Sequence, residues 1–133
     1  MLAKVFFPYR VEDGTKRPVI AFKAEGRDGR QIQLEGLLDS GADNSIFPYE
    51  LVEMLGIRLG GEPKNSTGIC GDECISGYTA AVNLDVVGKP VICEVEVLLP
   101  KHKLDRVILG RKGIFDEHRI CFLEGGITIE SRD

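Results

Sequence analysis

The chain has 133 residues with a formal net charge of -4, and 43% of its residues are hydrophobic. This length predicts one domain over residues 1–133, large enough to bury a core without disulfide or metal staples. The acidic balance argues against a nucleic-acid partner, which usually needs a basic face. No apolar run approaches the roughly 18 residues of a membrane span, and the first ten residues meet a proline and charges too early for a signal peptide. We therefore expect a cytoplasmic protein with no membrane partner.

The first third of the chain predicts short antiparallel strands. Asp13–Lys16 is a polar turn, and Arg27–Arg30 contains an Asp-Gly turn signal that favours a hairpin. Polar and apolar residues alternate behind that second turn, as in a strand with one buried face. The predicted strands are Lys4–Phe7, Pro18–Phe22 and Gln31–Leu37.

The clearest chemical signal is the stretch from Leu37 to Phe47, which reads LLDSGADNSIF. An apolar run delivers Asp39 to a turn of Ser, Gly and Ala, residues small enough to let a carboxylate lie close to another backbone. Taken alone, Asp-Ser-Gly is also a common polar turn, because all three residues favour turns for local reasons. The triplet therefore needs a second motif before it indicates chemistry.

The middle of the chain predicts one short helix and a glycine-rich hairpin. Phe47–Gly56 has proline near its start, apolar residues on one face and a glycine that can end it. A loop is expected from Gly60 to Ser66. Thr67–Gly77 is punctuated by glycines, which suits either a mobile lid or an ordinary surface hairpin.

The last half of the chain predicts further strands and a second short helix. Tyr78–Val87 and Pro90–Leu99 alternate around a compact turn, and Arg106–Leu109 is a continuous apolar run. Arg111–Phe115 is typical of a short helix. A final hairpin is expected from strands over Arg119–Leu123 and Ile127–Glu130, joined at Glu124–Gly126.

The four cysteines, Cys70, Cys74, Cys93 and Cys121, do not have the spacing of a zinc site. Only the first two are close, whereas structural zinc sites usually offer two tight pairs, so we expect no metal and no cofactor. Cys93 alternates with valines and is expected on the buried face of a strand. Cys70 and Cys74 would lie near one another across a hairpin tip, although a reducing cytoplasm predicts free thiols.

Two motifs together resemble a known family. Leu37–Asp43, reading LLDSGAD, and Val107–Arg111, reading VILGR, resemble the signature pair of the retropepsin-like aspartic proteases, the single-domain relatives of the retroviral proteases. The resemblance covers roughly residues 31–115. It implies an all-β fold, a small closed β-barrel with one or two short helices, that dimerises so that each subunit gives one aspartate to a shared site. The sequence contains no second Asp-Ser-Gly or Asp-Thr-Gly, so one chain cannot supply both aspartates.

The resemblance also implies a role for each matching residue. The expected activity is that of a homodimeric aspartic endopeptidase, which hydrolyses an extended peptide or protein substrate with water activated between two Asp39 carboxyls. Asp43 would bind the substrate backbone and form a partly buried pair with Arg111, and residues 67–77 would be the flap that closes over the substrate. The expected catalytic residues are Asp39, Ser40 and Gly41, the expected substrate-binding residues are Ala42, Asp43, Asn44, Ile69, Cys70 and Gly71, and the expected structural supports are Gly110 and Arg111.

Two alternatives to this activity are open. The same fold could act as a non-catalytic dimerisation and peptide-binding module, because a fold does not fix function. A serine mechanism would use Ser40 as nucleophile with His102 or His118 as base. Nothing around Ser40 resembles a strand-to-helix nucleophile elbow, and both histidines are expected in exposed, charged stretches.

Overall fold

A computed structural model describes residues 4–26, 28–65 and 76–132. The first elements of the chain are β1 (Lys4–Pro8), β2 (Arg10–Glu12), β3 (Thr15–Arg17), β4 (Val19–Glu25), β5 (Gln31–Leu38), β6 (Ser45–Phe47) and α1 (Leu51–Leu55). The remaining elements are β7 (Gly60–Asn65), β8 (Ser76–Asp85), β9 (Pro90–Leu98), β10 (Val107–Leu109), the irregular turn η1 (Arg111–Phe115), β11 (His118–Phe122) and β12 (Gly126–Ser131).

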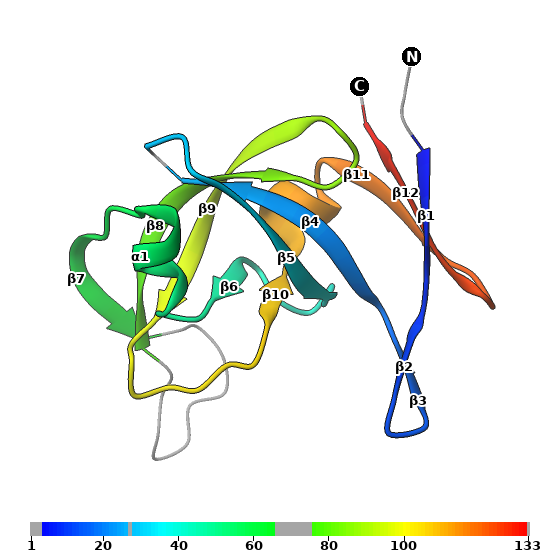
Figure 1. The fold of residues 1–133 in the computed structure, drawn as a ribbon, viewed down its shortest axis with the longest axis horizontal. Helices are drawn as coiled ribbons and strands as arrows, with labels where there is room; N and C mark the ends of the chain where they lie inside the picture. The colour runs from blue at the N-terminus through cyan, green and yellow to red at the C-terminus, as the bar shows by residue number, and fades with distance from the viewer. Residues whose placement is uncertain (1–3, 27, 66–75, 133) are drawn as a thin grey trace.

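Six strands close into a barrel, which confirms the predicted all-β fold (Figure 1). Their order is β4-β5-β10-β6-β9-β8, and β4 pairs again with β8 through Lys23 and Asp85 to close the ring. β7 pairs antiparallel with the first residues of the long strand β8 and lies outside the ring. Two of the pairings, β5 with β10 and β6 with β9, are parallel, and the other pairings in this ring are antiparallel.

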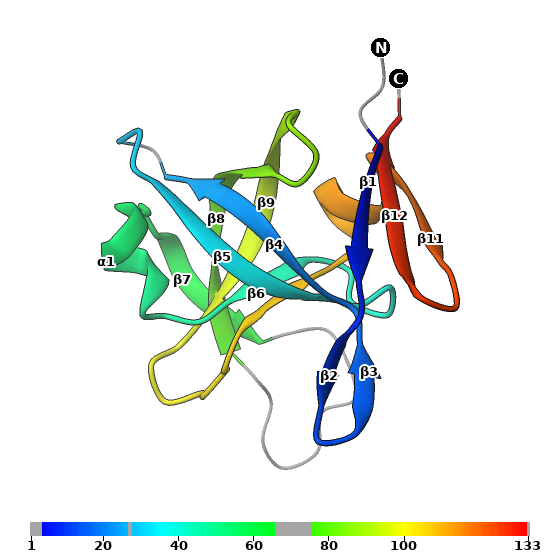
Figure 2. The same ribbon diagram turned by 45° about the vertical axis from the view of Figure 1, so that its right-hand side comes forward.

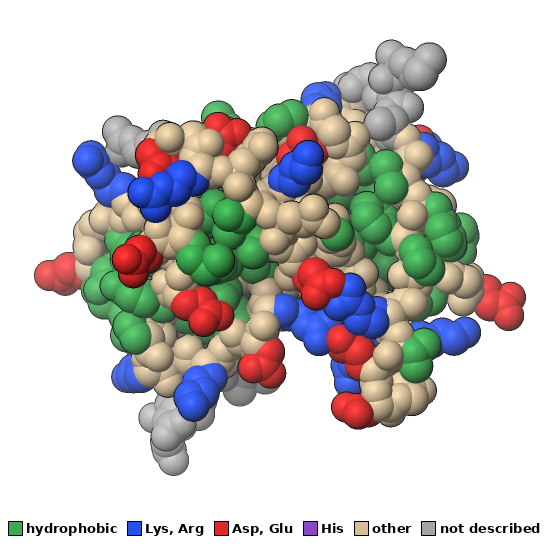
Figure 3. Space-filling view, viewed as in Figure 1, with side chains coloured by type: hydrophobic (Ala, Val, Ile, Leu, Met, Phe, Trp, Pro, Cys, Tyr) green, Lys and Arg blue, Asp and Glu red, His purple; other side chains and the backbone are tan. Residues whose placement is uncertain are grey.

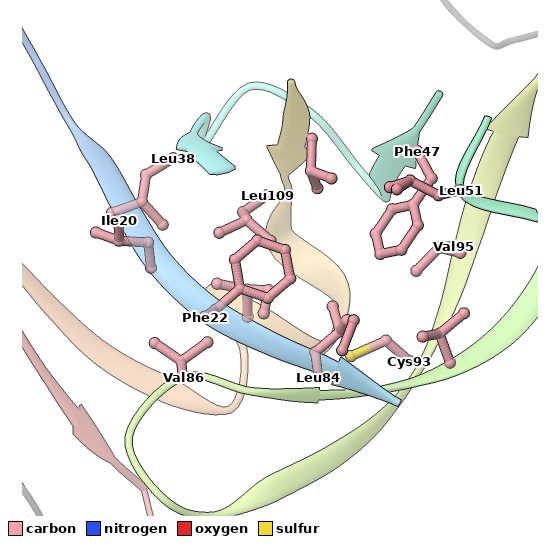
Figure 4. Packing of buried hydrophobic residues seen from close by; sticks show 14 of the residues in the cluster. Ile20, Phe22, Leu38, Phe47, Leu51, Leu84, Val86, Cys93, Val95 and Leu109 are labelled. Carbon is pink, nitrogen blue, oxygen red and sulfur yellow. The ribbon is translucent and has the colours of Figure 1, made fainter. Parts of the chain in front are cut away.

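The barrel interior holds the hydrophobic core, because alternate residues of each strand point inward. Figure 4 shows side chains from opposite walls meeting there, among them Phe22 of β4, Phe47 of β6 and Cys93 of β9. Cys93 is 2% exposed, so its predicted core position is confirmed. The fully buried side chains of this core include Phe47, Leu55, Leu84, Val95, Val97, Leu109 and Ile114.

The first and last strands lie in a second, three-stranded sheet of order β1-β12-β11 (Figure 2). Val5 and Phe7 of β1 pair with Ile129 and Ile127 of β12, and these residues pack toward the core. A separate two-stranded hairpin, β2–β3, lies between β1 and β4 in the chain and projects from the body of the molecule.

The predicted helix over Phe47–Gly56 is wrong at its start. Ser45–Phe47 is instead the strand β6, in parallel register with Val95–Val97 of β9, and the buried Phe47 belongs to the core. The helix begins at Leu51, after a turn in which Leu51 N donates to Pro48 O. It ends as expected at Gly56, whose φ of 63° is the left-handed conformation that glycine adopts without strain.

Two further local predictions are also corrected. Gly60–Asn65, expected within a loop, is the edge strand β7, whose pairing with β8 shifts register between Gly60 and Lys64. This irregular pairing leaves no polar-apolar alternation in the sequence, which is why the strand was missed. Arg111–Phe115 is a single irregular turn and not a regular helix, because Gly113 has a φ of 82° and packs directly on the Cys93 sulfur.

Within the described ranges, no helix is long and apolar enough to cross a membrane.

Candidate active site

The barrel topology brings the two sequence motifs together. β10 lies between β5 and β6, parallel to β5, so that Leu109 is opposite Leu38. The residue that follows β5 is Asp39, whose backbone N donates to the carbonyl of Leu109 at 2.9 Å. The parallel alignment therefore places the ends of both strands, and the loops that follow them, at one end of the barrel.

A tight turn presents Asp39 at the surface. Gly41 N donates to Asp39 Oδ1 at 2.9 Å, and Ala42 N donates to the Asp39 carbonyl at 3.2 Å. Asp39, Ser40 and Gly41 are all exposed, and a Cβ at Gly41 would lie 3.2 Å from Asp39 Oδ1. The small residues thus let the backbone of the turn fold back onto the carboxylate.

Gly110 packs against the backbone of the same loop. A Cβ at this position would lie 2.4 Å from the carbonyl oxygen of Asn44 and 2.8 Å from that of Ala42, which is too close for any side chain. Arg111 N donates to the Ala42 carbonyl at 2.9 Å. The absence of a side chain at Gly110 therefore allows the VILGR segment to brace the loop that carries Asp39.

Ser45 is a supporting residue that sequence reasoning missed. Its side chain is fully buried, and its Oγ accepts a hydrogen bond from Gly110 N at 3.0 Å. One feature of the sequence indicates this burial: Ser45 and Phe47 are two residues apart, so their side chains share the inward face of a strand. A buried hydroxyl usually has a hydrogen-bond partner, and here that partner belongs to the second motif.

Asp43 and Arg111 form the ion pair that the resemblance implies, and Lys112 N also donates to the Asp43 carbonyl at 2.9 Å. The expectation that the pair is partly buried is corrected for the single chain, because the two side chains are 53% and 51% exposed. An ion pair this exposed contributes at most about 1 kcal/mol to folding stability.

Asn44 lies beside this pair with one polar atom unsatisfied. Its Oδ1 is buried and has no hydrogen-bond partner in the part of the chain that the structure describes. Buried acceptors without partners are uncommon in folded proteins, so this oxygen is a local cost to the stability of the single chain.

The two histidines differ from expectation. His118 is not in an exposed stretch: it is 1% exposed at the start of β11, and its Nδ1 lies 2.7 Å from the carbonyl oxygen of Ile114. His102 is half-buried in the segment between β9 and β10. The buried ring of His118 is thus engaged with the backbone at Ile114 and not with Ser40, which gives no support to a serine mechanism based on this histidine.

Several predictions fall on residues outside the described ranges. These are the substrate contacts of Ile69, Cys70 and Gly71, the proximity of Cys70 to Cys74, and nearly all of the predicted flap, 67–77. Within the described ranges, no three His, Cys, Asp or Glu side chains come together as a metal site.

Comparisons with known proteins support the fold. No family model matches the sequence, and no curated protein sequence matches it. The crystal structure of a retropepsin-like aspartic protease from Rickettsia conorii matches with a TM-score of 0.62 at 17% sequence identity, covering 98% of this chain and 93% of that chain. EIAV protease, in a structure complexed with the inhibitor HBY-793, matches with a TM-score of 0.51 at 25% identity, covering 77% of this chain and 88% of that chain. The resemblance predicted from the two sequence motifs is confirmed.

Proposed function

We propose that this chain, whose fold is that of the retropepsin-like aspartic proteases, is an aspartic endopeptidase that works as a homodimer. The observation that carries the proposal is the position of Asp39. It is exposed at one end of the barrel, on a turn fixed by Leu109 and braced by Gly110. Because these backbone contacts hold the turn, Asp39 can meet a second carboxyl without a rearrangement of its loop.

The chemistry follows from two such loops related by a two-fold axis. Two carboxyls about 3 Å apart cannot both ionise at low cost, so the pair shares one proton. The ionised Asp39 takes a proton from a water molecule between them, and the water attacks the peptide carbonyl. The protonated Asp39 hydrogen-bonds to the oxygen on which negative charge develops. When the tetrahedral intermediate collapses, the C–N bond breaks and the proton taken from the water passes to the leaving nitrogen. This route needs neither a metal nor a covalent intermediate.

The residues after Asp39 are suited to hold the substrate backbone. Asp43 keeps a half-exposed carboxylate next to Arg111, and the residues on either side of it, Ala42 and Asn44, are partly exposed. An extended peptide supplies backbone N–H groups at regular intervals, and an exposed carboxylate can accept hydrogen bonds from them. We therefore infer that residues 42–44 bind the substrate backbone.

The direct test compares Asp39→Asn with Asp105→Asn, which makes the same change at an exposed aspartate between β9 and β10. We expect Asp39→Asn to abolish peptide cleavage and to keep its fold by circular dichroism, whereas the control cleaves like the wild type. Cleavage by the wild type should also be inhibited by pepstatin-type compounds. Normal cleavage by Asp39→Asn would overturn the proposal, and peptide binding without any wild-type cleavage would favour the binding-module alternative.

A further inference from the structure

The β2–β3 hairpin begins next to the catalytic loop. Leu38 N donates to the Pro18 carbonyl at 3.0 Å, and Val19 lies opposite Leu37 in the β4–β5 register. Pro18 directly follows β3, and Leu38 directly precedes Asp39. The base of the hairpin is therefore paired with the last residue of the strand that delivers the catalytic aspartate.

Beyond this point the two segments part. The chain turns back at Asp39, where Ala42 N bonds to the Asp39 carbonyl, whereas the hairpin continues the path of β4 away from the barrel (Figures 1 and 2). A strand rises about 3.3 Å per residue, so the three residues of β3 extend roughly 10 Å past the base. An extended substrate advances by a similar length per residue, so 10 Å is about three residues of substrate.

The hairpin is built as a compact, defined element. Asp13 and Gly14 have φ of 50° and 76°, the conformation of a two-residue hairpin turn, and Val11 lies opposite Lys16 in the register. One face of the ribbon therefore carries Arg10, Glu12, Thr15 and Arg17, and the other carries Val11 and Lys16.

Ion pairs fix the first of these faces to the barrel. Arg106, just before β10, donates from Nη2 to both carboxylate oxygens of Glu12 at 2.9 and 2.7 Å, and Arg17 Nε lies 3.4 Å from Glu12. The Glu12 and Arg106 side chains are 25% and 29% exposed, so this pair is partly shielded from solvent. Arg10 pairs with Glu35 of β5, and their hydrogen bond lowers the pKa of Glu35.

The second face is free of such contacts. Val11 is 64% exposed, and Lys16 is exposed with no ion pair among the described residues. In Figure 3 the hairpin stands out from the lower edge of the molecule, and a hollow separates it from the rest of that edge on this face. An exposed apolar side chain beside a lysine can bind a segment that carries apolar and acidic residues.

We propose that the β2–β3 hairpin is a fixed specificity arm that contacts the substrate about three or more residues from the cleaved bond, with Lys16 selecting an acidic side chain there and Val11 an apolar one. This inference rests on the proposed function. The pairing of Leu38 with Pro18 and the anchoring by Glu12 hold the arm at a set distance from Asp39. In a two-fold dimer one arm would extend from each of the two catalytic loops.

The test uses three peptides, one short and two long, built on one cleavable sequence that is selected from a peptide library. The short peptide ends two residues on either side of the cleaved bond, and the long one carries either Glu or Lys at the fourth and fifth positions on both sides. We expect the wild type to cleave the long acidic peptide about three- to ten-fold more efficiently, in kcat/KM, than the long basic one, since exposed charge pairs supply differences of this order. Lys16→Glu should reverse that order and leave the short peptide unchanged.

Lys23→Glu is the matched control, because Lys23 is exposed on β4, toward the end of that strand remote from the hairpin. It should behave as the wild type on all three peptides. If Lys16→Glu keeps the wild-type preference, or changes the short and long peptides equally, the specificity arm is refuted while the protease assignment stands. If the wild type cleaves no peptide of either length, the proposed function and this inference both fail.

Discussion

Gly110→Ala tests how the two motifs support one another. The added Cβ would lie 2.4 and 2.6 Å from the carbonyl oxygen and carbon of Asn44 and 2.8 Å from the carbonyl oxygen of Ala42. All three atoms are backbone, so the loop that carries Asp39 or the VILGR segment must move. Gly110 has an ordinary extended conformation, with φ of -102° and ψ of -166°, so the substitution adds no dihedral strain.

Two opposing effects set the size of the change. Overpacking of this kind typically costs about 1–3 kcal/mol, and three backbone contacts place Gly110→Ala near the upper end of that range. Replacing glycine also restricts the unfolded chain, which recovers roughly 0.4–1 kcal/mol. The net loss should be about 2 kcal/mol, which corresponds to a lowering of the urea midpoint by about 1 M for an m-value near 2 kcal/mol/M.

Urea unfolding of Gly110→Ala should be compared with that of Gly125→Ala, where a Cβ meets nothing within 4 Å. The control should match the wild type or be slightly more stable. We also expect Gly110→Ala to lose cleavage, because the shift displaces the loop that carries Asp39. A Gly110→Ala protein as stable and as active as Gly125→Ala would refute the bracing role of this glycine.

Two further predictions concern charge. Arg111→Gln should lower the unfolding free energy of the single chain by less than about 1 kcal/mol, because its pair with Asp43 is half exposed, yet it should reduce kcat/KM. Arg119→Gln, which removes the ion pair of an exposed arginine with Glu130, should leave kcat/KM unchanged. Equal activities of the two variants would contradict a role for Arg111 in the site. Burial, with a smaller contribution from Glu117, raises the pKa of the Cys93 thiol from 9.0 to about 11. Between these values the thiol keeps its proton in the folded state and loses it in the unfolded state, so the free energy of unfolding should fall from about pH 9 to about pH 11. Chemical denaturation across that pH range should show this fall in unfolding free energy, of up to about 3 kcal/mol, in the wild type but not in Cys93→Ala. If the unfolding free energies of the two proteins change equally with pH, the prediction is contradicted.

Much of the fold could be predicted because the longer strands carry a regular pattern. Residues 31–38 and 90–98 alternate along one buried face, and their strands were predicted nearly to their ends. The three-residue strand β6 offers too few positions for a period to show, and Phe47 was therefore assigned to the helix that follows. β7 is an edge strand with a register shift, and a sequence pattern does not report such irregular pairing.

The candidate site was predictable only in part, for a physical reason. Asp39 and Gly110 stand in motifs that can be recognised along the chain, but the burial of their neighbours depends on which strands meet. The hydrogen bond from Gly110 to Ser45, and the half-exposed state of the Asp43–Arg111 pair, arise from the position of β10 between β5 and β6. No local signal near Asp13 indicated that the polar turn belonged to a hairpin fixed by the distant Arg106.

The central claim, that two copies of Asp39 form one site, is tested most directly by mixing subunits. Wild-type and Asp39→Asn chains are allowed to exchange at a fixed total concentration, and cleavage is measured against the wild-type fraction. If each active site needs two intact aspartates, activity falls as the square of that fraction, and an equal mixture retains about one quarter. A linear decline, with about one half retained in the equal mixture, would show that one chain suffices and would contradict the shared site.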